Sequence, residues 1–194
     1  NNKERKILIA LHMQPEMSTS LLAGDYDDQI RIIEKIYRNK FSDNLLILVR
    51  EHPAQTFYQR DELFFRRLKT LKNLKFINRD FPIEKLLPSM DFVVTSSGTI
   101  GWEALNLGKK CLLFGNSWYS NLHGVMKITN ITSDEEIIKF FDEKFDNDLF
   151  NTSLQNLYES FYDGIVLKWY IPMDPDFDEK NNSKKVIKEI KKYL

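Results

Sequence analysis

Residues 93–105 read Val-Val-Thr-Ser-Ser-Gly-Thr-Ile-Gly-Trp-Glu-Ala-Leu. The run from Phe92 to Thr95 is apolar or β-branched, which is typical of a buried parallel strand. The small residues 96–99, here called the serine loop, lead into a helix that Ser97 or Thr99 would cap. Free amides and the dipole at the start of a helix favour an anion such as phosphate. An ordinary capped helix has the same short pattern, so this stretch alone leaves both interpretations open.

Two further residues of this stretch suit a ligand. Gly98 has no side chain, so its backbone would approach a bound molecule closely. Glu103 follows Thr99 by one helical turn and lies on the same face. Its carboxylate would accept hydrogen bonds from sugar hydroxyls beside the phosphate.

Working outward from this stretch, strands and helices alternate along the chain. Apolar runs predict strands at 6–11, 45–49, 74–77, 92–95, 110–114 and an edge strand at 125–128. Helical periodicity predicts helices at 25–40, 61–71, 81–87, 99–107, 133–141, 149–170 and 183–193, with Gly108 ending the fourth. The alternation predicts an α/β fold, a Rossmann-like parallel sheet with helices on both faces. We expect this domain to span 1–131, with a helical tail at 132–194.

Composition excludes several classes of protein. The 28 basic and 28 acidic residues balance, which argues against a nucleic-acid binder that works through a general positive field. The single cysteine, Cys111, lies in an apolar run and offers neither a disulfide framework nor a metal site. No apolar stretch is long enough to cross a membrane, and the first residues have no signal-peptide core. We therefore expect a cytoplasmic protein that binds no metal.

Polar residues follow the predicted strands at one rim of the sheet. Gln14 and Glu16 follow the first strand, His52 the second, the serine loop the fourth, and Trp118 with Tyr119 the fifth. Ligands of open parallel sheets bind outside the carboxyl ends of the strands, so four such loops predict a nucleotide-binding crevice.

Each of these residues also has a structural interpretation. His52 precedes Pro53, which restricts it, and a histidine in this position is often structural. Glu16 would be a solvated loop acid, and the aromatic pair at 118 and 119 fits the core slightly better than the floor under a sugar ring. His12 and His123 are weaker candidates.

Four segments together resemble a known family. They are residues 12–19 (His-Met-Gln-Pro-Glu-Met-Ser-Thr), 50–53 (Arg-Glu-His-Pro), 96–105 and 114–119 (Phe-Gly-Asn-Ser-Trp-Tyr). In order and spacing they are similar to bacterial capsular polysaccharide biosynthesis proteins and transferases that use CMP-Kdo. They resemble bacterial sialyltransferases more distantly. The resemblance covers roughly residues 6–128.

The resemblance implies a GT-B glycosyltransferase and roles for particular residues. The donor's CMP phosphate would be bound by His52, Ser96, Ser97, Gly98 and Thr99. Glu103 would hold the ribose, the backbone around Phe81 and Ile83 would face the cytosine, and Gln14 and Glu16 would lie near the transferred sugar. No cofactor or metal is implied, and Glu16 is only a weak candidate for catalysis.

A GT-B enzyme has two Rossmann-like domains, whereas this sequence predicts one. The resemblance therefore implies the carboxyl-terminal half, with tail helices that would pack on a missing amino-terminal domain. Its partners would be a nucleotide-sugar donor carrying Kdo or a sialic-acid-like sugar, and a polysaccharide or glycolipid acceptor at the inner face of the membrane. The alternatives are a CDP-glycerol-type glycerophosphotransferase, a sugar-nucleotide 2-epimerase, whose serine-glycine-glycine loop is not matched, and a non-catalytic nucleotide-sugar-binding module.

Overall fold

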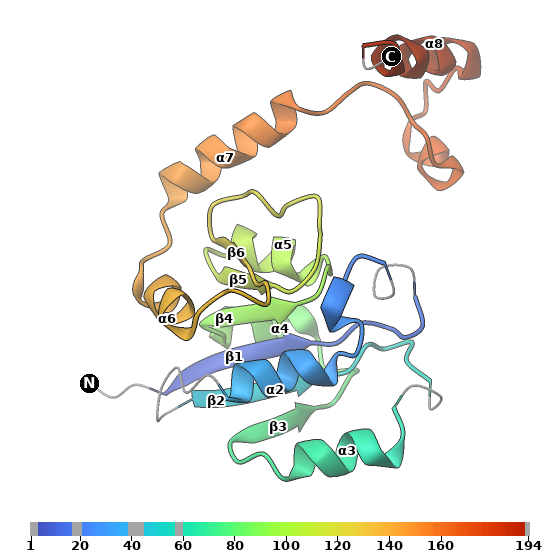
Figure 1. Cartoon of the computed structure of the whole chain (residues 1–194). Coiled ribbons are helices and arrows are strands. Elements are labelled where there is room, and N and C mark those ends of the chain that lie inside the picture. Colours follow the sequence, from blue (N-terminus) through green and yellow to red (C-terminus); the bar gives the residue numbers. More distant parts are fainter. Residues whose placement is uncertain (1–3, 17–20, 39–44, 57–59, 193–194) are drawn as a thin grey trace. The chain divides into compact units, whose positions relative to one another are not determined.

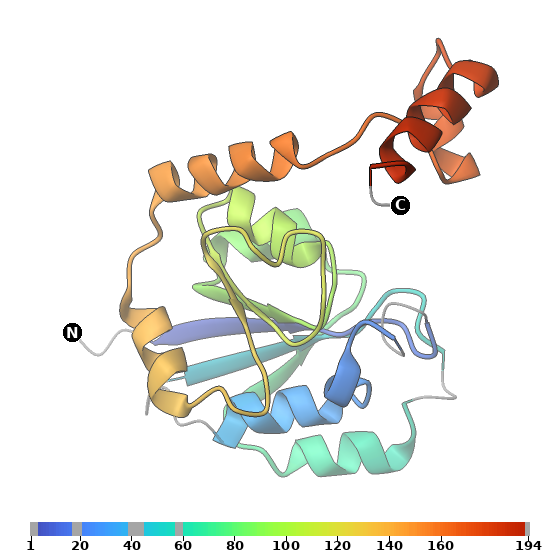
Figure 2. The same cartoon turned by 45° about the horizontal axis from the view of Figure 1, so that its top comes forward.

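The structure is a computed structural model that describes residues 4–16, 21–38, 45–56 and 60–192 (Figures 1 and 2). The chain divides into two compact units, residues 1–153 and 154–194.

The first unit is built on a six-stranded parallel sheet. Its strands are β1 (Arg5–Ala10), β2 (Leu45–Arg50), β3 (Leu74–Ile77), β4 (Phe92–Thr95), β5 (Lys110–Leu113) and β6 (Val125–Lys127). They lie in the order β3-β2-β1-β4-β5-β6, and every neighbouring pair is parallel. This order places a topological switch point between β1 and β4. The predicted α/β Rossmann-like fold is confirmed, and β6 is the edge strand as expected.

Helices cover both faces of the sheet (Figure 2). They are α2 (Ile30–Arg38), α3 (Glu62–Lys69), α4 (Ile83–Leu86), α5 (Ile100–Asn106) and α6 (Asp134–Asp142). Successive residues of β1 point to opposite faces. Ile7 and Ile9 therefore pack with the buried residues of α2, α3 and α6, whereas Leu8 packs with those of α4 and α5.

Local sequence chemistry explains where several elements begin and end. A capping box begins α6, because the side chains of Ser133 and Glu136 each accept a hydrogen bond from the other's backbone N–H. Gly108 has φ +66° just after α5, as a glycine at a helix end should. The predicted helix at 25–40 is shorter: a 3₁₀ turn, Gly24–Tyr26, precedes α2, and residues 39 and 40 lie outside the described residues.

The first unit extends beyond the expected boundary at residue 131. Helix α6 packs on the sheet, since Ile137 is buried in the core and the Phe141 ring lies 4.0 Å from that of Phe92. Helix α7 (Asn147–Glu159) begins in this unit, where Phe150 is buried. In the part of the chain that the structure describes, Phe150 is also the last buried residue.

The second unit contains the end of α7, a 3₁₀ helix (Lys168–Met173) and α8 (Glu179–Ile190). The expected helix at 149–170 is therefore wrong beyond Glu159, and Gly164, at φ +140°, lies in the irregular segment that follows. Helix α8 begins four residues earlier than expected because Asp178 caps it, accepting a bond from the Asn181 amide at 2.6 Å. The Asn182 side chain joins α8 to the backbone of Ile165 by two hydrogen bonds. Within the described ranges, no helix is long and apolar enough to cross a membrane.

Candidate functional site

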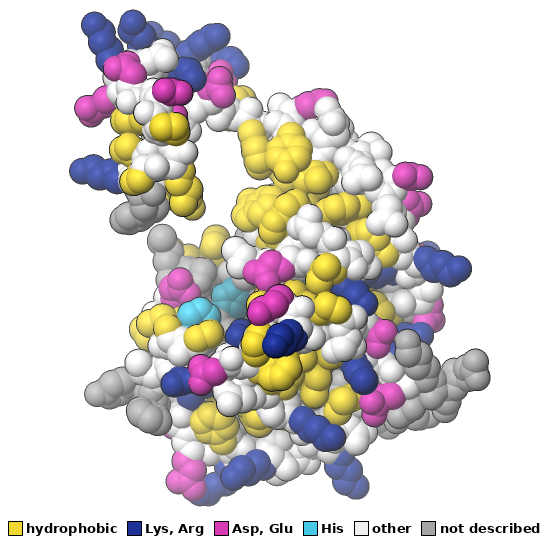
Figure 3. Space-filling view, turned by 180° about the vertical axis from the view of Figure 1, so that it is seen from behind, with side chains coloured by type: hydrophobic (Ala, Val, Ile, Leu, Met, Phe, Trp, Pro, Cys, Tyr) yellow, Lys and Arg dark blue, Asp and Glu magenta, His cyan; other side chains and the backbone are white. Residues whose placement is uncertain are grey.

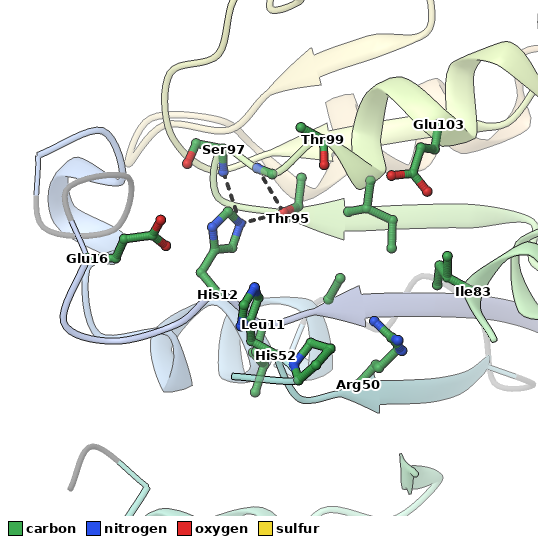
Figure 4. Close-up of a pocket in the computed structure, with 14 residues that line it drawn as sticks. Leu11, His12, Glu16, Arg50, His52, Ile83, Thr95, Ser97, Thr99 and Glu103 are labelled. Atoms are coloured by element: carbon green, nitrogen blue, oxygen red, sulfur yellow. Dashed lines mark hydrogen bonds between the residues drawn. The ribbon is translucent and has the colours of Figure 1, made fainter. Parts of the chain in front are cut away.

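A cavity of about 380 Å³ opens at the carboxyl ends of β1, β2 and β4, beside the switch point of the sheet (Figure 4). We call it the rim cavity. It is lined by Ala10, Leu11, His12, Glu16, Arg50, His52, Pro53, Ile83, Thr95, Ser97, Gly98, Thr99, Ile100 and Glu103. Seven of the residues singled out in the sequence are among these, namely Glu16, His52, Ile83, Ser97, Gly98, Thr99 and Glu103. On the face shown in Figure 3, histidine and acidic side chains lie close together.

His52 is held at the end of β2 by its own turn. Its backbone N–H donates to the Glu51 carboxylate at 2.8 Å, and its Nδ1 accepts from the Ala54 amide at 3.2 Å. Because Nδ1 is an acceptor, we assign the ring proton of the neutral imidazole to Nε2. The ring therefore has one N–H that can donate to an anion.

The serine loop differs from expectation at two positions. Ser96 does not line the rim cavity: it is fully buried, and its Oγ has no hydrogen-bond partner among the described residues. Thr99 is the N-cap of α5 but its side chain makes no capping hydrogen bond, because the backbone already has helical angles, φ −60° and ψ −20°. Helix α5 has only seven residues, so an anion site here depends on side chains more than on a helix dipole.

Different residues line the two ends of the rim cavity (Figure 4). Ile83, Arg50 and Glu103 lie at one end and Glu16 at the other. The Arg50 guanidinium donates from Nη2 to the carbonyl oxygens of Arg79 and Phe81, at 2.8 and 3.3 Å. Phe81 is exposed and does not line the cavity, although its carbonyl thus fixes Arg50.

Gln14 also lies outside the lining, because its side chain is bonded within the protein. Its Oε1 accepts from Arg60, and its Nε2 donates to the carbonyl of Asp27. Arg60 is buried and forms an ion pair with Glu51 at 2.7 Å. The Gln55 side chain bonds to both the N–H and the carbonyl of Gln14. This network ties the loop after β1 to the loop after β2.

The aromatic pair after β5 packs away from the cavity. Tyr119 is fully buried, and its hydroxyl donates a hydrogen bond to the carbonyl of Gly98. This bond helps to fix the backbone of the serine loop. Trp118 is half exposed and packs against Trp102, with ring centroids 5.0 Å apart. The structural interpretation of Tyr119 is the one that the geometry supports.

Comparison of the sequence with models of protein families identifies the family of this chain. A family model described as "Capsule polysaccharide biosynthesis protein" matches residues 1–162. The chain belongs to this family. A search of curated proteins finds no match.

Two solved structures have a fold similar to that of this chain. KpsC from Thermosulfurimonas dismutans, described as a beta Kdo 2,7 transferase, superposes with a TM-score of 0.52 at 13% identity, covering 72% of this chain and 45% of that one. A UDP-GlcNAc 2-epimerase from Methanocaldococcus jannaschii, solved with UDP-GlcNAc and UDP, gives a TM-score of 0.54 at 18% identity, covering 82% and 46%. The chain thus spans less than half the length of either structure.

In this member of the capsule polysaccharide biosynthesis family, sequence reasoning missed or underrated three cavity residues: His12, Arg50 and Thr95. Arg50 and Thr95 are the last residues of β2 and β4, and His12 lies two residues after the end of β1, so all three side chains meet the rim. Burial lowers the pKa of His12 to about 4, and His52 and Arg60 act in the same direction against an opposing effect of Glu16. The sequence signal that could have identified these three residues is a polar side chain at or just after the end of an apolar strand.

Among the described residues no group of three His, Cys, Asp or Glu side chains could hold a metal ion.

Proposed function

We propose that this chain is the donor-binding part of a glycosyltransferase that moves a Kdo or sialic-acid-like sugar from a CMP-activated donor to a surface polysaccharide. One observation carries the proposal: His52, Ser97 and Thr99 line one cavity together with Glu103, at the switch point of the sheet. Nucleotides bind at such points in parallel α/β folds. Membership of the capsule polysaccharide biosynthesis family supports the polysaccharide product.

The lining suggests how a nucleotide would lie in the cavity. The Nε2 proton of His52 and the hydroxyls of Ser97 and Thr99 would donate to the phosphate, which becomes the leaving group. Fixed donors directed at a group that gains negative charge lower the barrier to its departure. Glu103 would accept hydrogen bonds from ribose hydroxyls, and the base would lie towards Ile83 and Arg50.

The transferred sugar would then occupy the end of the cavity near Glu16, away from Glu103 (Figure 4). Glu16 is the candidate for a catalytic carboxylate among the residues that line this end of the cavity. The rest of the active site would come from sequence outside this chain, since the solved structures it resembles are more than twice as long as the part it matches. Positioning of two substrates supplies up to about 7–11 kcal/mol of barrier lowering, so the chain alone should bind a donor but not transfer sugar.

Calorimetric titration tests the proposal directly. CMP should bind more tightly than UMP, UDP or GMP without added divalent metal. His52→Ala and Ser97→Ala should each weaken CMP binding roughly ten- to hundredfold, because a hydrogen bond to a charged group contributes about 1.5–3 kcal/mol. Cytidine, which has no phosphate, should bind both variants like the unmodified chain.

Matched controls lie outside the rim cavity. His123→Ala and Ser89→Ala remove the same side chains at positions that do not line it, so CMP affinity should be unchanged. Preference for CDP would favour a glycerophosphotransferase, and preference for UDP would favour the epimerase chemistry of the second solved structure. Sustained turnover by the isolated chain with CMP-Kdo and a polysaccharide acceptor would refute the division of labour between two domains.

A further inference from the structure

Three hydrogen bonds hold the backbone of His12. Its N–H donates to Gln29 Oε1 at 2.6 Å, and its carbonyl accepts from Gln29 Nε2 at 3.0 Å and from Arg60 Nη2 at 3.1 Å. Gln29 and Arg60 are themselves buried. The imidazole, whose residue is only 8% exposed, therefore has a defined place at the end of β1.

The ring points at the serine loop (Figure 4). Its Nε2 lies 2.8 Å from Thr95 Oγ1 and 3.4 Å from the Ser97 amide nitrogen, and the Gly98 amide donates to Thr95 Oγ1 at 3.3 Å. An amide N–H can only donate, so Nε2 is an acceptor and the ring is neutral with its proton on Nδ1. The Thr95 hydroxyl then donates to Nε2 and accepts from Gly98. The backbone N–H of Ser97 thus points at His12, and that of Gly98 points at Thr95.

The loop also packs on the ring. A Cβ added to Gly98 would lie 2.9 Å from Thr95 Oγ1 and 3.0 Å from His12 Nε2, distances that real Cβ atoms do not tolerate without movement of their neighbours. The glycine expected to approach a ligand is therefore required by close contact with His12 and Thr95.

We propose that His12 is a positioning residue, which acts through Thr95 and the amide of Ser97 to hold the serine loop in the shape that presents its hydroxyls to a nucleotide phosphate. The proposal rests on the proposed function. It differs from the role of His52, because the Nε2 of His12 is an acceptor and would repel a phosphate oxygen. The low pKa of His12 fits this role, since the ring stays neutral at pH 7.

Two substitutions separate the acceptor from the bulk of the ring. His12→Gln places an amide oxygen near the position of Nε2, whereas His12→Leu keeps similar volume and removes the acceptor. We expect the Gln variant to bind CMP within about threefold of the unmodified chain. The Leu variant should bind roughly five- to thirtyfold more weakly, the effect of losing two neutral hydrogen bonds. Equal CMP affinity of the Leu variant and the unmodified chain would overturn the proposal.

Amide hydrogen exchange gives a readout that needs no ligand. Exchange at Ser97 and Gly98 should be several-fold faster in His12→Leu than in the unmodified chain and should be restored in His12→Gln. If the unmodified chain binds no nucleotide, the proposed function fails, and the exchange rates still decide the role of His12. Unchanged exchange in the Leu variant would then refute it.

A second variant covers the case in which His12→Leu does not fold. Thr95→Val keeps the shape of the buried side chain and removes only the hydroxyl between His12 and Gly98. Like His12→Leu, it should weaken CMP binding and speed amide exchange at Gly98. If neither changes, His12 does not position the loop through Thr95.

Discussion

The two units of the chain contain similar proportions of apolar residues but bury them to different extents. In the first unit the strands and helices bury their apolar side chains in two clusters, one on each face of the sheet. In the second unit the large apolar residues Tyr158, Phe161, Tyr162, Val166, Leu167, Tyr170, Met173, Ile187 and Ile190 are exposed. Helical periodicity is thus sufficient to form a helix, but a core requires a second surface. A unit without one has little stability of its own.

The largest expected effect contrasts two isoleucines. Ile9→Ala removes a side chain that is 1% exposed in β1 and should lower the free energy of unfolding by about 2–5 kcal/mol. Ile187→Ala removes one that is 51% exposed in α8 and should change it by less than about 0.5 kcal/mol. Urea denaturation followed by tryptophan fluorescence measures both. A large loss from Ile187→Ala would show that the second unit has a core of its own.

Acid should lower the stability of the first unit through protonation of His12. Burial lowers its pKa from 6.5 to about 4, with Glu16 opposing and His52 and Arg60 assisting. The unfolded chain therefore binds this proton first, so stability is complete above pH 6.5 and is lost as the pH falls towards 4. The loss should reach about 3 kcal/mol at pH 4.

His12→Gln is the reference for this measurement, because all other titrating groups are common to both proteins. Urea denaturation at pH 7 and pH 4 should show a smaller acid loss in the variant. Amides of α8 should exchange equally in both proteins. If both proteins lose the same stability, His12 is not buried as a neutral ring.

The smallest expected effect is local to the second unit. Asn182→Ala removes the two hydrogen bonds to Ile165, 2.6 and 2.9 Å long, and should reduce local stability by about 1 kcal/mol. Hydrogen exchange should rise about fivefold for amides of α8 and stay constant for those of β1. Lys184→Ala, an exposed change on the same helix, is the control. Faster exchange in β1 would show that the effect is not local to α8.

The sheet was predictable because most of its strands contain a short apolar run. The strands at 45–49 and 74–77, for example, were placed within one residue of β2 and β3. The tail was less predictable, since apolar residues continue at helical spacing beyond Glu159 although the helix stops there. Periodicity records which residues would share a face, and it contains no information on what that face contacts.

The lining of the rim cavity was predictable at the level of loops but not of individual side chains. Ser96 and Ser97 are neighbours of the same type, yet only Ser97 lines the rim cavity. Their directions depend on the turn after β4, which the sequence does not specify. His12 was underrated because its environment comes from Gln29, Arg60 and Thr95, which are 17, 48 and 83 residues away. Contacts at such separations leave no local pattern.

The reactivity of the Lys110 side chain should report whether α6 stays packed on the sheet. This residue of β5 is 5% exposed, and its ammonium group donates to the carbonyl oxygens of Phe140 and Glu143 while lying 4.6 Å from the centre of the Phe140 ring. An acylating reagent cannot reach this nitrogen until the end of α6 moves away. Lys139, exposed on the same helix, should be modified at an ordinary rate. The ratio of the two labelling rates would therefore record how often α6 leaves the sheet.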